Sequence, residues 1–349
     1  MAEKIDFIVL WVDGADPEWQ KERAAFCPDA VNNGSDVNRF RDWDLMRYWF
    51  RGVEHFAPWV NRVFFVTSGQ VPQWLNTAHP KLRLVKHEDY IPSQYLPTFN
   101  SNVIELWLNR IPELSEHFVL FNDDMFLTAP VGPEDFFKNG LPMEMALMDM
   151  ATAPDPGDCL PHMQINNFAV INRHFNKKEV LKRNAGKFFT YKYGRELLRN
   201  ILLFPFQYFS CFRDSHLPSS YLKRTFDCVW KEEGELLAQC SHNRFRSKSD
   251  LTHWLMKCWQ ICEGNFEARS SRWGRHFELW EDDIDQICRC IQKEKYHAFC
   301  LNDSKTEIDF ARIQKRLSES FEKILPEVSS YETDSVQSDA GKDRGSCNE

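Results

Sequence analysis

The stretch FVLFNDDMFL, residues 118–127, decides how this chain is expected to fold. Apolar residues fill it on both sides of Asn122, Asp123 and Asp124, which predicts one buried strand over 117–127. An aspartate in such a place is usually explained as a helix cap or a turn residue. Two adjacent carboxylates in an apolar run lose hydration and repel each other, so a functional reason is favoured here.

Strands and helices alternate over the first 130 residues. Apolar runs rich in β-branched and aromatic residues predict strands, and the first run ends at the turn signal DGADP. Apolar stripes at helical spacing predict helices between them. This alternation indicates an α/β fold with a central sheet flanked by helices. Strands are predicted at 5–12, 62–69, 82–89 and 117–127, and helices at 42–58 and 100–114.

The second half of the chain is predicted to be mainly helical and to pack on the sheet. We expect one domain over residues 1–328, in which an α/β part at 5–130 is completed by a mainly helical part at 160–328. The tail at 329–349 is polar and is expected to be disordered. Helices are predicted at 162–184, 190–206, 219–240, 247–266 and 307–325, with a short apolar run at 296–304.

Composition excludes several classes of protein. The 349 residues carry a formal net charge of −8, which argues against general binding to nucleic acid. No apolar stretch reaches about 18 residues, so no transmembrane segment is expected. Eleven cysteines without a CxxC pair indicate reduced thiols in a cytoplasmic protein. Peripheral attachment to the inner face of the cell membrane and the oligomeric state are left open.

Three apolar runs end in acidic or amide side chains. Asp13 follows the first run, residues 122–124 interrupt the second, and Asn302 and Asp303 follow the third. If the three runs were parallel neighbours, these groups would converge beyond the carboxyl ends of the strands, where α/β sheets bind ligands. Clustered carboxylate oxygens suit Mg²⁺, which in turn suits phosphate.

Arginines and histidines supply complementary groups. Arg41, Arg47 and Arg51 lie on or near the first predicted helix, and guanidinium groups bind phosphate well. The alternative is a solvated helix face, whose ion pairs contribute about 0–1 kcal/mol each. His216 or His162 could act as a general base, because histidine titrates near neutral pH. Phosphate-loop, GxGxxG, GxSxG and HExxH motifs are missing from the sequence.

Four blocks of the sequence resemble the conserved regions of the Stealth proteins. The first two are IDFIVLWVDGADPEW and RFRDWDLMRYWFRGVEHFAPWVNRVFFVTSGQVPQWLN, and the second continues through LPTFNSNVIELWLNRIPELSEHFVLFNDDMFL. The last two are HLPSSYLKRTFDCVWKEEGELLAQCSHNRFRSKSDL and FCLNDS. Stealth proteins are sugar-phosphate transferases of bacterial capsule synthesis. The catalytic part of the animal N-acetylglucosamine-1-phosphotransferase belongs to the same family.

The resemblance implies a Rossmann-like, glycosyltransferase-like sheet and a specific reaction. Sugar-1-phosphate would pass from a nucleotide-diphosphate sugar, for example a UDP-N-acetylhexosamine, to a hydroxyl of a glycan or polysaccharide acceptor. A phosphodiester would form and a nucleoside monophosphate would be released, in the synthesis of capsular or other surface polysaccharide. A conventional glycosyltransferase and a non-catalytic glycan-binding protein are the alternatives. The sugar, the nucleotide and the acceptor are left open.

The resemblance also implies roles for individual residues. Asp123, Asp124, His216 and Arg246 would be catalytic, which favours His216 over His162 but leaves open whether His216 or Asp124 is the general base. A Mg²⁺ or Mn²⁺ ion would be held by Asp124, Asp303 and Asn302. The donor would be bound by Trp11, Asp13, Gly14, Arg39, Asp42, Arg47, Arg51, Ser101, Glu105 and Asn122.

Overall fold

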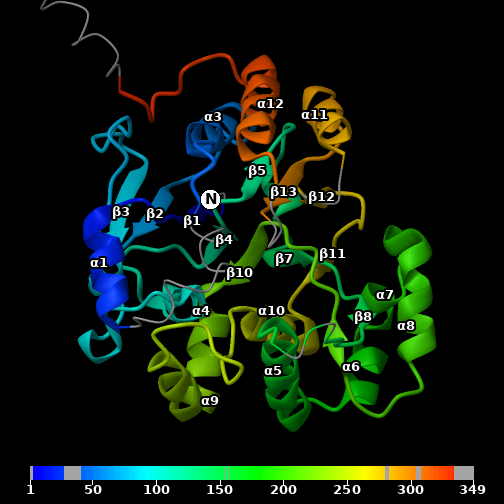
Figure 1. Ribbon diagram of the computed structural model, residues 1–349. Helices are drawn as coiled ribbons and strands as arrows, with labels where there is room; N and C mark the ends of the chain where they lie inside the picture. The colour runs from blue at the N-terminus through cyan, green and yellow to red at the C-terminus, as the bar shows by residue number, and fades with distance from the viewer. Residues whose placement is uncertain are drawn as a thin grey trace, which may run out of the picture.

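The central sheet is built from the apolar runs of the first 130 residues and one later strand. A computed structural model describes residues 3–26, 41–153, 155, 157–279, 283–303 and 308–333. The strands follow the order β10-β4-β1-β2-β3, and all are parallel except β10, which pairs antiparallel with β4 (Figure 1). The α/β fold with a Rossmann-like sheet is confirmed. The bounds of β1, β2, β3, β4 and β10 are Ile5–Leu10, Val63–Thr67, Leu82–Lys86, His117–Phe121 and Ser219–Leu222.

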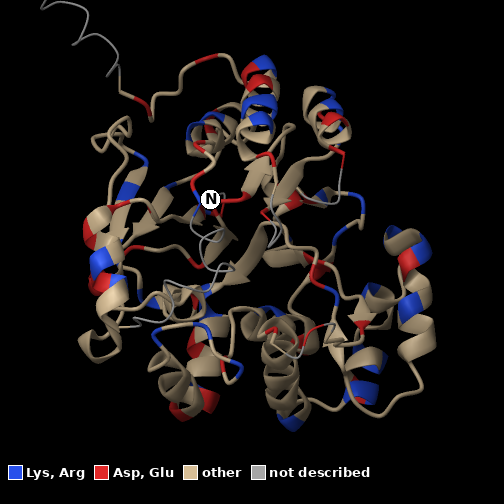
Figure 2. Ribbon diagram, viewed as in Figure 1, with Lys and Arg blue, Asp and Glu red and all other residues tan. Residues whose placement is uncertain are grey.

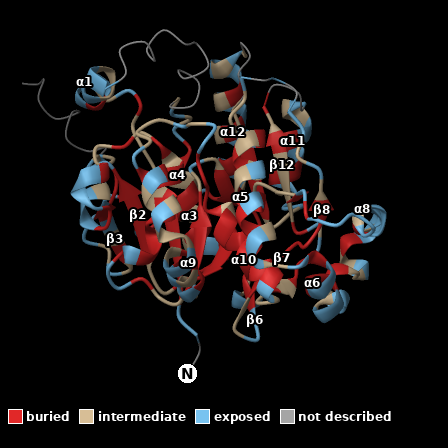
Figure 3. Cartoon of the chain, turned by 90° about the horizontal axis from the view of Figure 1, so that it is seen from below, coloured by how far each residue is buried: buried red, intermediate tan, exposed pale blue. Residues whose placement is uncertain are grey.

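Both faces of this sheet are covered. On β1, Phe7 and Val9 belong to one apolar cluster, whereas Ile8 belongs to the other. This alternation is the period of two that a strand buried on both sides requires. Figure 3 shows the buried residues concentrated on the sheet and on the helices beside it. The first cluster includes α3 (Met46–Phe56) and α12 (Phe310–Ile324), and the second includes α4 (Ser101–Leu106), α9 (Lys223–Ser241) and α10 (Trp254–Glu263).

The strands β1 and β4 are neighbours at the point where the chain reverses its direction across the sheet. From β1 the chain moves outward to β2 and β3, and it then returns to form β4 on the other side of β1. Doubly wound sheets bind their ligands beyond the carboxyl ends of strands at such a point. Asp13 follows β1 and Asp124 follows β4, so two of the three acidic runs meet there as predicted.

The third acidic run belongs to a second sheet, of order β12-β13-β5, so the condition that all three runs are parallel neighbours is not met. Its strands are Gly274–Glu278, Ala298–Asn302 and Met125–Leu127, and β13 pairs antiparallel with β5. The single strand predicted over 117–127 is also wrong, because the chain turns after β4. There the backbone N–H of Met125 donates to the carbonyl of Asn122 at 3.1 Å. This turn places Asp124 between the two sheets.

The helix predicted over 219–240 begins four residues later than expected. Residues 219–222, the first four of the predicted range, form β10 instead, and their side chains are all buried against β4. No Gly or Pro separates the strand from α9, so the boundary leaves no turn signal in the sequence.

The remaining elements complete the second half and the rim. The other helices are α1 (Pro17–Phe26), α5 (Leu160–His174), α6 (Lys177–Arg183), α7 (Ala185–Phe188), α8 (Leu197–Leu203) and α11 (Ile284–Gln292). Short strands are β6 (Phe137–Lys138), β7 (Leu141–Glu144), β8 (Met148–Asp149), β9 (Cys211–Phe212) and β11 (Glu267–Ala268). Single 3-10 turns are His87–Asp89, Ser93–Tyr95, Leu108–Arg110, Pro133–Asp135 and Tyr191–Glu196.

Residues 329–333 correct the prediction of a disordered tail, because they pack on the first half of the chain. Tyr331 is buried in the first apolar cluster, and Glu332 forms an isolated β-bridge with Leu75. Residues 334–349 lie outside the described residues.

Arg51 holds this C-terminal segment in place. Its guanidinium donates to both carboxylate oxygens of Glu332, at 2.8 and 3.2 Å, and to the carbonyl of Leu325 at 3.0 Å. It also pairs with Glu322 at 3.1 Å. Arg47 lies 3.6 Å from Glu332. The two arginines of α3 that were expected to bind the donor therefore face the C-terminal segment instead.

We predict that Arg51→Met lowers the free energy of unfolding by about 3 kcal/mol, because the carboxylate of Glu332 would stay buried without its partner. Urea unfolding measures this change. Arg183→Met is the control, since its exposed pair with Glu179 should matter by less than about 0.5 kcal/mol. If Arg51→Met left stability unchanged and weakened binding of the donor, Arg51 would be a donor-binding residue, as the resemblance implied.

Candidate active site

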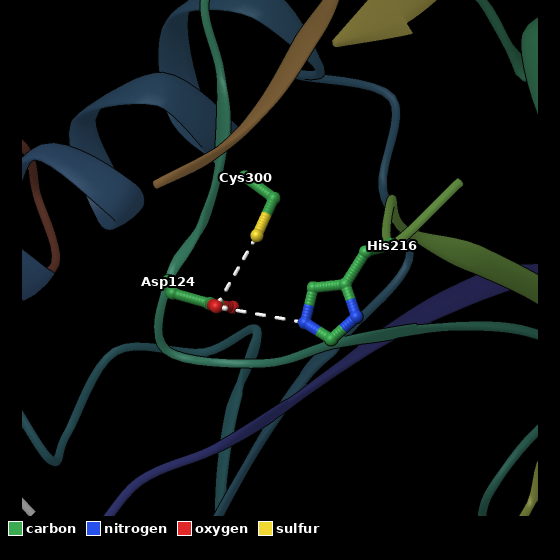
Figure 4. Close-up of side chains that lie close together, drawn as sticks. All are labelled: Asp124, His216 and Cys300. Carbon is green, nitrogen blue, oxygen red and sulfur yellow. Dashed lines mark hydrogen bonds and ion pairs between the residues drawn. The ribbon is translucent and has the colours of Figure 1, made fainter. Parts of the chain in front are cut away.

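Asp124, His216 and Cys300 meet beyond the carboxyl end of β4 (Figure 4). Oδ2 of Asp124 lies 3.6 Å from Nε2 of His216 and accepts a hydrogen bond from the Cys300 thiol at 3.2 Å. Oδ1 of Asp124 is buried and accepts no hydrogen bond within the described residues. A buried acceptor left in this state costs about 1–3 kcal/mol. Oδ1 is therefore a position at which a ligand would be stabilised.

His216 is presented by the loop that precedes β10. Its φ of 47° lies in the left-handed region, which residues other than glycine seldom adopt and which is often found at functional sites. Nδ1 of His216 faces Oδ2 of Asp214 at 3.5 Å. Asp214 is held in turn by Lys257 at 3.3 Å, and Lys257 pairs with Glu144 at 3.5 Å. A chain of alternating charges thus runs from Glu144 through His216 to Asp124.

These ion pairs determine the protonation states of His216 and Asp124. Burial disfavours a charged His216, but the carboxylates of Asp124 and Asp214 outweigh burial and raise the pKa of His216 well above its usual value. Burial also favours a neutral Asp124, yet His216 and Cys300 outweigh it and lower the pKa of that carboxyl. The ligand-free site therefore holds an imidazolium–carboxylate pair at neutral pH.

The adjacent Asp123 behaves differently. The side chain of Asp123 is exposed to solvent, but desolvation by the surrounding protein, followed by repulsion from Asp124 and Asp42, raises its pKa to about 7, against the attraction of Arg246. Neighbouring carboxyls whose pKa values are pushed apart are typical of acid–base sites. At neutral pH, Asp124 is ionised whereas Asp123 is divided between its two forms.

Arg246 lies on the α4 side of the site. Its Nη2 donates to Oγ of Ser101, at the start of α4, at 2.8 Å. Its charge acts on Asp123 and on Glu105, but burial still raises the pKa of Glu105 to about 8. Glu105 is therefore mostly protonated at neutral pH.

The loop that carries Arg246 is fastened to α4 by buried hydrogen bonds. Oδ2 of Asp250 accepts from Nδ2 of Asn100 at 2.9 Å and from Nδ2 of Asn102 at 3.0 Å. Asn100 is also the N-cap of α4, because its Oδ1 accepts from the backbone N–H of Asn102. The start of α4 and the Arg246 loop are thus positioned as one unit.

The loop after β1 brings Asp13 toward the same acidic groups. Gln70, after β2, accepts from the backbone N–H of Asp13 and donates to its carbonyl, both at 2.9 Å. Asp42 is exposed to solvent, but desolvation by the surrounding protein raises its pKa, and the carboxylates of Asp44 and Asp13 add to the effect. Asp42 in turn raises the pKa of Asp123. The carboxyl groups of Asp13, Asp42 and Asp123 therefore influence one another's protonation at the strand ends.

The predicted metal ligands Asn302 and Asp303 lie at the end of β13, beside Asp124. A backbone N–H of β13 donates to the carbonyl of Asp124 at 2.9 Å. Asp303 pairs with Arg41 at 3.8 Å, and the Asn302 side-chain amide donates to Glu278 at 2.8 Å.

The remaining predicted residues lie at several different places in the chain. Trp11 stacks on the core with a centroid distance of 5.5 Å to the ring of Phe65, and Gly14 is buried in the loop that follows. Asn122 forms the turn after β4. Arg39 lies outside the described residues. His162 is in the first turn of α5, and within the described residues it is not part of the group around Asp124.

Three residues of the site were missed from the sequence. Asp214 stands two residues before His216 in RDSHL, and that spacing was the available signal for a carboxylate that orients the imidazole. Lys257 lies inside α10 and Cys300 inside an apolar strand, so neither carries a local signal. Their contacts exist only because distant segments pack together.

Among the described residues, the potential metal ligands that lie within 4.8 Å of one another are those of Asp124, His216 and Cys300, and the predicted ligand Asp303 is not part of this group. Carboxylate and amide oxygens of Asp124, Asn302 and Asp303 are the donors that Mg²⁺ and Mn²⁺ prefer. The imidazole and thiol of His216 and Cys300 would suit a softer metal, but they already engage Oδ2 of Asp124.

Comparisons with known proteins identify related sequences. Family models for conserved regions 1 and 2 of the Stealth proteins match residues 3–26 and 39–144. A capsular polysaccharide phosphotransferase, WcwK of Streptococcus pneumoniae, is 42% identical, covering 95% of this chain and 98% of its own length. The receptor polysaccharide phosphotransferase WefC of Streptococcus gordonii is also 42% identical, with 95% and 100% coverage. The exopolysaccharide phosphotransferase cps2G of Lactiplantibacillus plantarum is 39% identical, with 94% and 96% coverage.

The fold and the site define an α/β protein with a histidine–carboxylate centre at its strand ends. The chain belongs to the Stealth family. Among solved structures, the galactosyltransferase LgtC covers 93% of this chain and 98% of its own at 10% identity, with a TM-score of 0.38, which is too distant to support an argument. None of the helices in the described part of the chain is long and apolar enough to span a membrane.

We predict that Asp214→Asn lowers the pKa of His216, because a negative charge facing Nδ1 is removed. An NMR titration of the imidazole carbon-bound protons measures it. Asp285→Asn, on the exposed surface of α11, should leave the His216 titration unchanged. An unaltered His216 pKa in Asp214→Asn would contradict the charge chain.

We also predict that Glu105→Gln makes the protein more stable than the wild type at pH 8 and about equally stable at pH 4. The folded state raises the pKa of Glu105 from 4.5 to about 8, so the unfolded state loses the proton first and wild-type stability falls between these values. The slope is at most about 1.4 kcal/mol per pH unit. Urea unfolding across this range measures it, with the exposed Glu88→Gln as control. Parallel pH curves for the wild type and Glu105→Gln would refute the prediction.

Proposed function

We propose that this protein transfers sugar-1-phosphate from a nucleotide-diphosphate sugar to a hydroxyl of a glycan acceptor, in the synthesis of a surface polysaccharide. The acceptor oxygen attacks the phosphorus that carries the sugar, and the bond to the nucleoside monophosphate breaks. The names of the relatives support phosphotransfer in capsular polysaccharide synthesis. The observation that carries the proposal is His216, held between Asp124 and Asp214 beyond the end of β4.

His216 receives the proton in this proposal. The acceptor hydroxyl loses a proton as it attacks, and an imidazole oriented at Nδ1 by Asp214 presents Nε2 for that purpose. His216 must first be neutral. Asp124 helps to hold its proton, so a ligand that compensates the charge of Asp124 lowers the pKa of His216 and prepares the base.

Arg246 and Arg41 balance the charge of the donor diphosphate. Phosphoryl transfer depends on charge neutralisation and in-line placement more than on covalent help from the protein. Arg246 lies on the loop between α9 and α10, where it contacts Ser101, and Arg41 pairs with Asp303, so the two guanidinium groups come from different parts of the chain. We assign donor contacts to Trp11, Asp13, Gly14, Asp42, Ser101, Glu105 and Asn122.

Asp124, Asp303 and Asn302 are the residues that we assign to a Mg²⁺ or Mn²⁺ ion. When bound, such an ion supplies further neutralisation of phosphate charge. Asp124 directs Oδ2 toward His216 and Cys300 and leaves Oδ1 without a hydrogen bond in the described part of the chain.

Two alternative functions remain distinguishable by experiment. A conventional glycosyltransferase would use the same acidic edge but would break the bond between the sugar and the phosphate. A glycan-binding protein would need no base, and the assembly of His216, Asp214 and Asp124 does not favour it.

We predict that incubation with a UDP-N-acetylhexosamine, Mg²⁺ and an acceptor glycan yields nucleoside monophosphate. The acceptor mass should increase by the sugar plus a phosphate, because the bond between the two phosphates is the one that breaks. Chromatography of nucleotides and mass spectrometry of the acceptor measure both products. Nucleoside diphosphate with a plain glycosidic product would establish the conventional glycosyltransferase.

We predict that Asp124→Asn lowers kcat by about 100-fold or more, because the residue that pairs with His216 loses its charge. Steady-state release of nucleotide measures it. The matched control is Asp285→Asn on α11, which should retain wild-type kcat. Full turnover in Asp124→Asn would contradict the assigned site.

A further inference from the structure

One face of α8 turns apolar side chains toward solvent. Leu198, Ile201 and Leu202 share a face at helical spacing, and each is more than half exposed. The polar Asn200 points inward instead, where its amide donates to two backbone carbonyls at 2.6 and 2.9 Å. An ordinary surface helix directs its apolar side chains to the core. In α8 this orientation is reversed, because the apolar side chains face solvent and a polar one faces the core.

The apolar surface continues on both sides of this helix. Phe204, Phe206 and Tyr208 follow it and are each more than half exposed, and Tyr191 before it is 88% exposed. We call these side chains, together with those of Leu198, Ile201 and Leu202, the α8 patch. Figure 1 shows α8 at the periphery of the molecule, away from the central sheet. Apolar groups gathered on one surface usually mark a contact with a partner or a membrane.

The segment that carries the α8 patch contains an excess of basic residues, some of which pair with acids outside the segment. Residues 173–213 contain ten Lys or Arg and only two Asp or Glu, a net charge of +8 in a chain whose net charge is −8. Lys178, Lys182 and Arg195 are exposed, and Figure 2 shows basic residues on α6 and α8. The exposed Lys and Arg side chains give the patch a basic border.

The positive charge also reaches into a neighbouring cavity of about 490 Å³, which Tyr191 helps to line. Lys192, Arg269 and Arg272 line it as well, against a single acid, Asp135. Arg269 is buried, and its Nε has no acceptor within the described residues. Anionic groups are therefore favoured next to the apolar surface.

We propose that the α8 patch docks this protein on an anionic lipid bilayer. Aliphatic and aromatic side chains enter the boundary between head groups and acyl chains, while Lys and Arg around them attract anionic head groups. A second copy of this chain would bring the same positive charge against itself, so self-association fits this face less well. The proposal concerns a surface outside the candidate active site and is independent of the reaction catalysed there.

Flotation of the full chain with lipid vesicles tests this inference. Vesicles of phosphatidylcholine alone are compared with vesicles containing roughly one part phosphatidylglycerol to two parts phosphatidylcholine, which supply the negative charge. The test variant is Ile201→Glu on α8, and the matched control is Ile165→Glu on α5, since the two isoleucines are 53% and 54% exposed. Circular dichroism confirms that both variants are folded.

We expect the wild type and Ile165→Glu to float with the anionic vesicles and to bind phosphatidylcholine alone more weakly. Ile201→Glu should bind at least about tenfold more weakly, because a charge replaces an inserted apolar side chain. Absence of wild-type binding to the anionic vesicles would overturn the proposal, as would equal losses in the two variants. A wild-type dimer in light scattering that Ile201→Glu converts to monomer would assign the patch to self-association instead.

Discussion

Asp124 is a half-buried carboxylate at the end of a central strand, and its buried oxygen needs compensation for the water it has lost. The contacts around Asp124 supply part of that compensation. Oδ2 is satisfied by His216 and Cys300, whereas Oδ1 has no hydrogen bond within the described residues. The half-satisfied carboxylate is what makes the site receptive to a ligand. Neither a fully hydrogen-bonded aspartate nor an exposed one would hold His216 protonated and present an oxygen to a cation at the same time.

The groups that compensate Asp124 come from distant parts of the chain, and the fold determines how they arrive. Asp124 lies between β4 of the central sheet and β5 of the second sheet. There the thiol of Cys300, on β13, donates a hydrogen bond to it. His216 is carried by the loop before the antiparallel edge strand β10, and a buried ion-pair chain through Lys257 supports its other side. Rigid elements thus position each contact, which is the condition for reproducible geometry at a site.

The parallel sheet was predictable because its strands are apolar runs ended by turn residues, and Asp124 was predictable because it interrupts such a run. The second sheet was not, since β5 pairs with a strand that lies far away in sequence. For the same reason Cys300 and Lys257 could not be assigned. Arg51 looked like a phosphate ligand on a helix face, but its partner Glu332 lies in a segment whose polar composition suggested disorder.

The central claim is that Oδ1 of Asp124 receives a cation beside the donor phosphates. The most direct measurement is a crystal structure with Mn²⁺ and a nucleotide sugar, in which anomalous scattering locates the metal. The account predicts a peak within bonding distance of Oδ1, with the diphosphate between it and Arg246. A peak away from Asp124, or a nucleotide sugar bound on another face of the molecule, would contradict it.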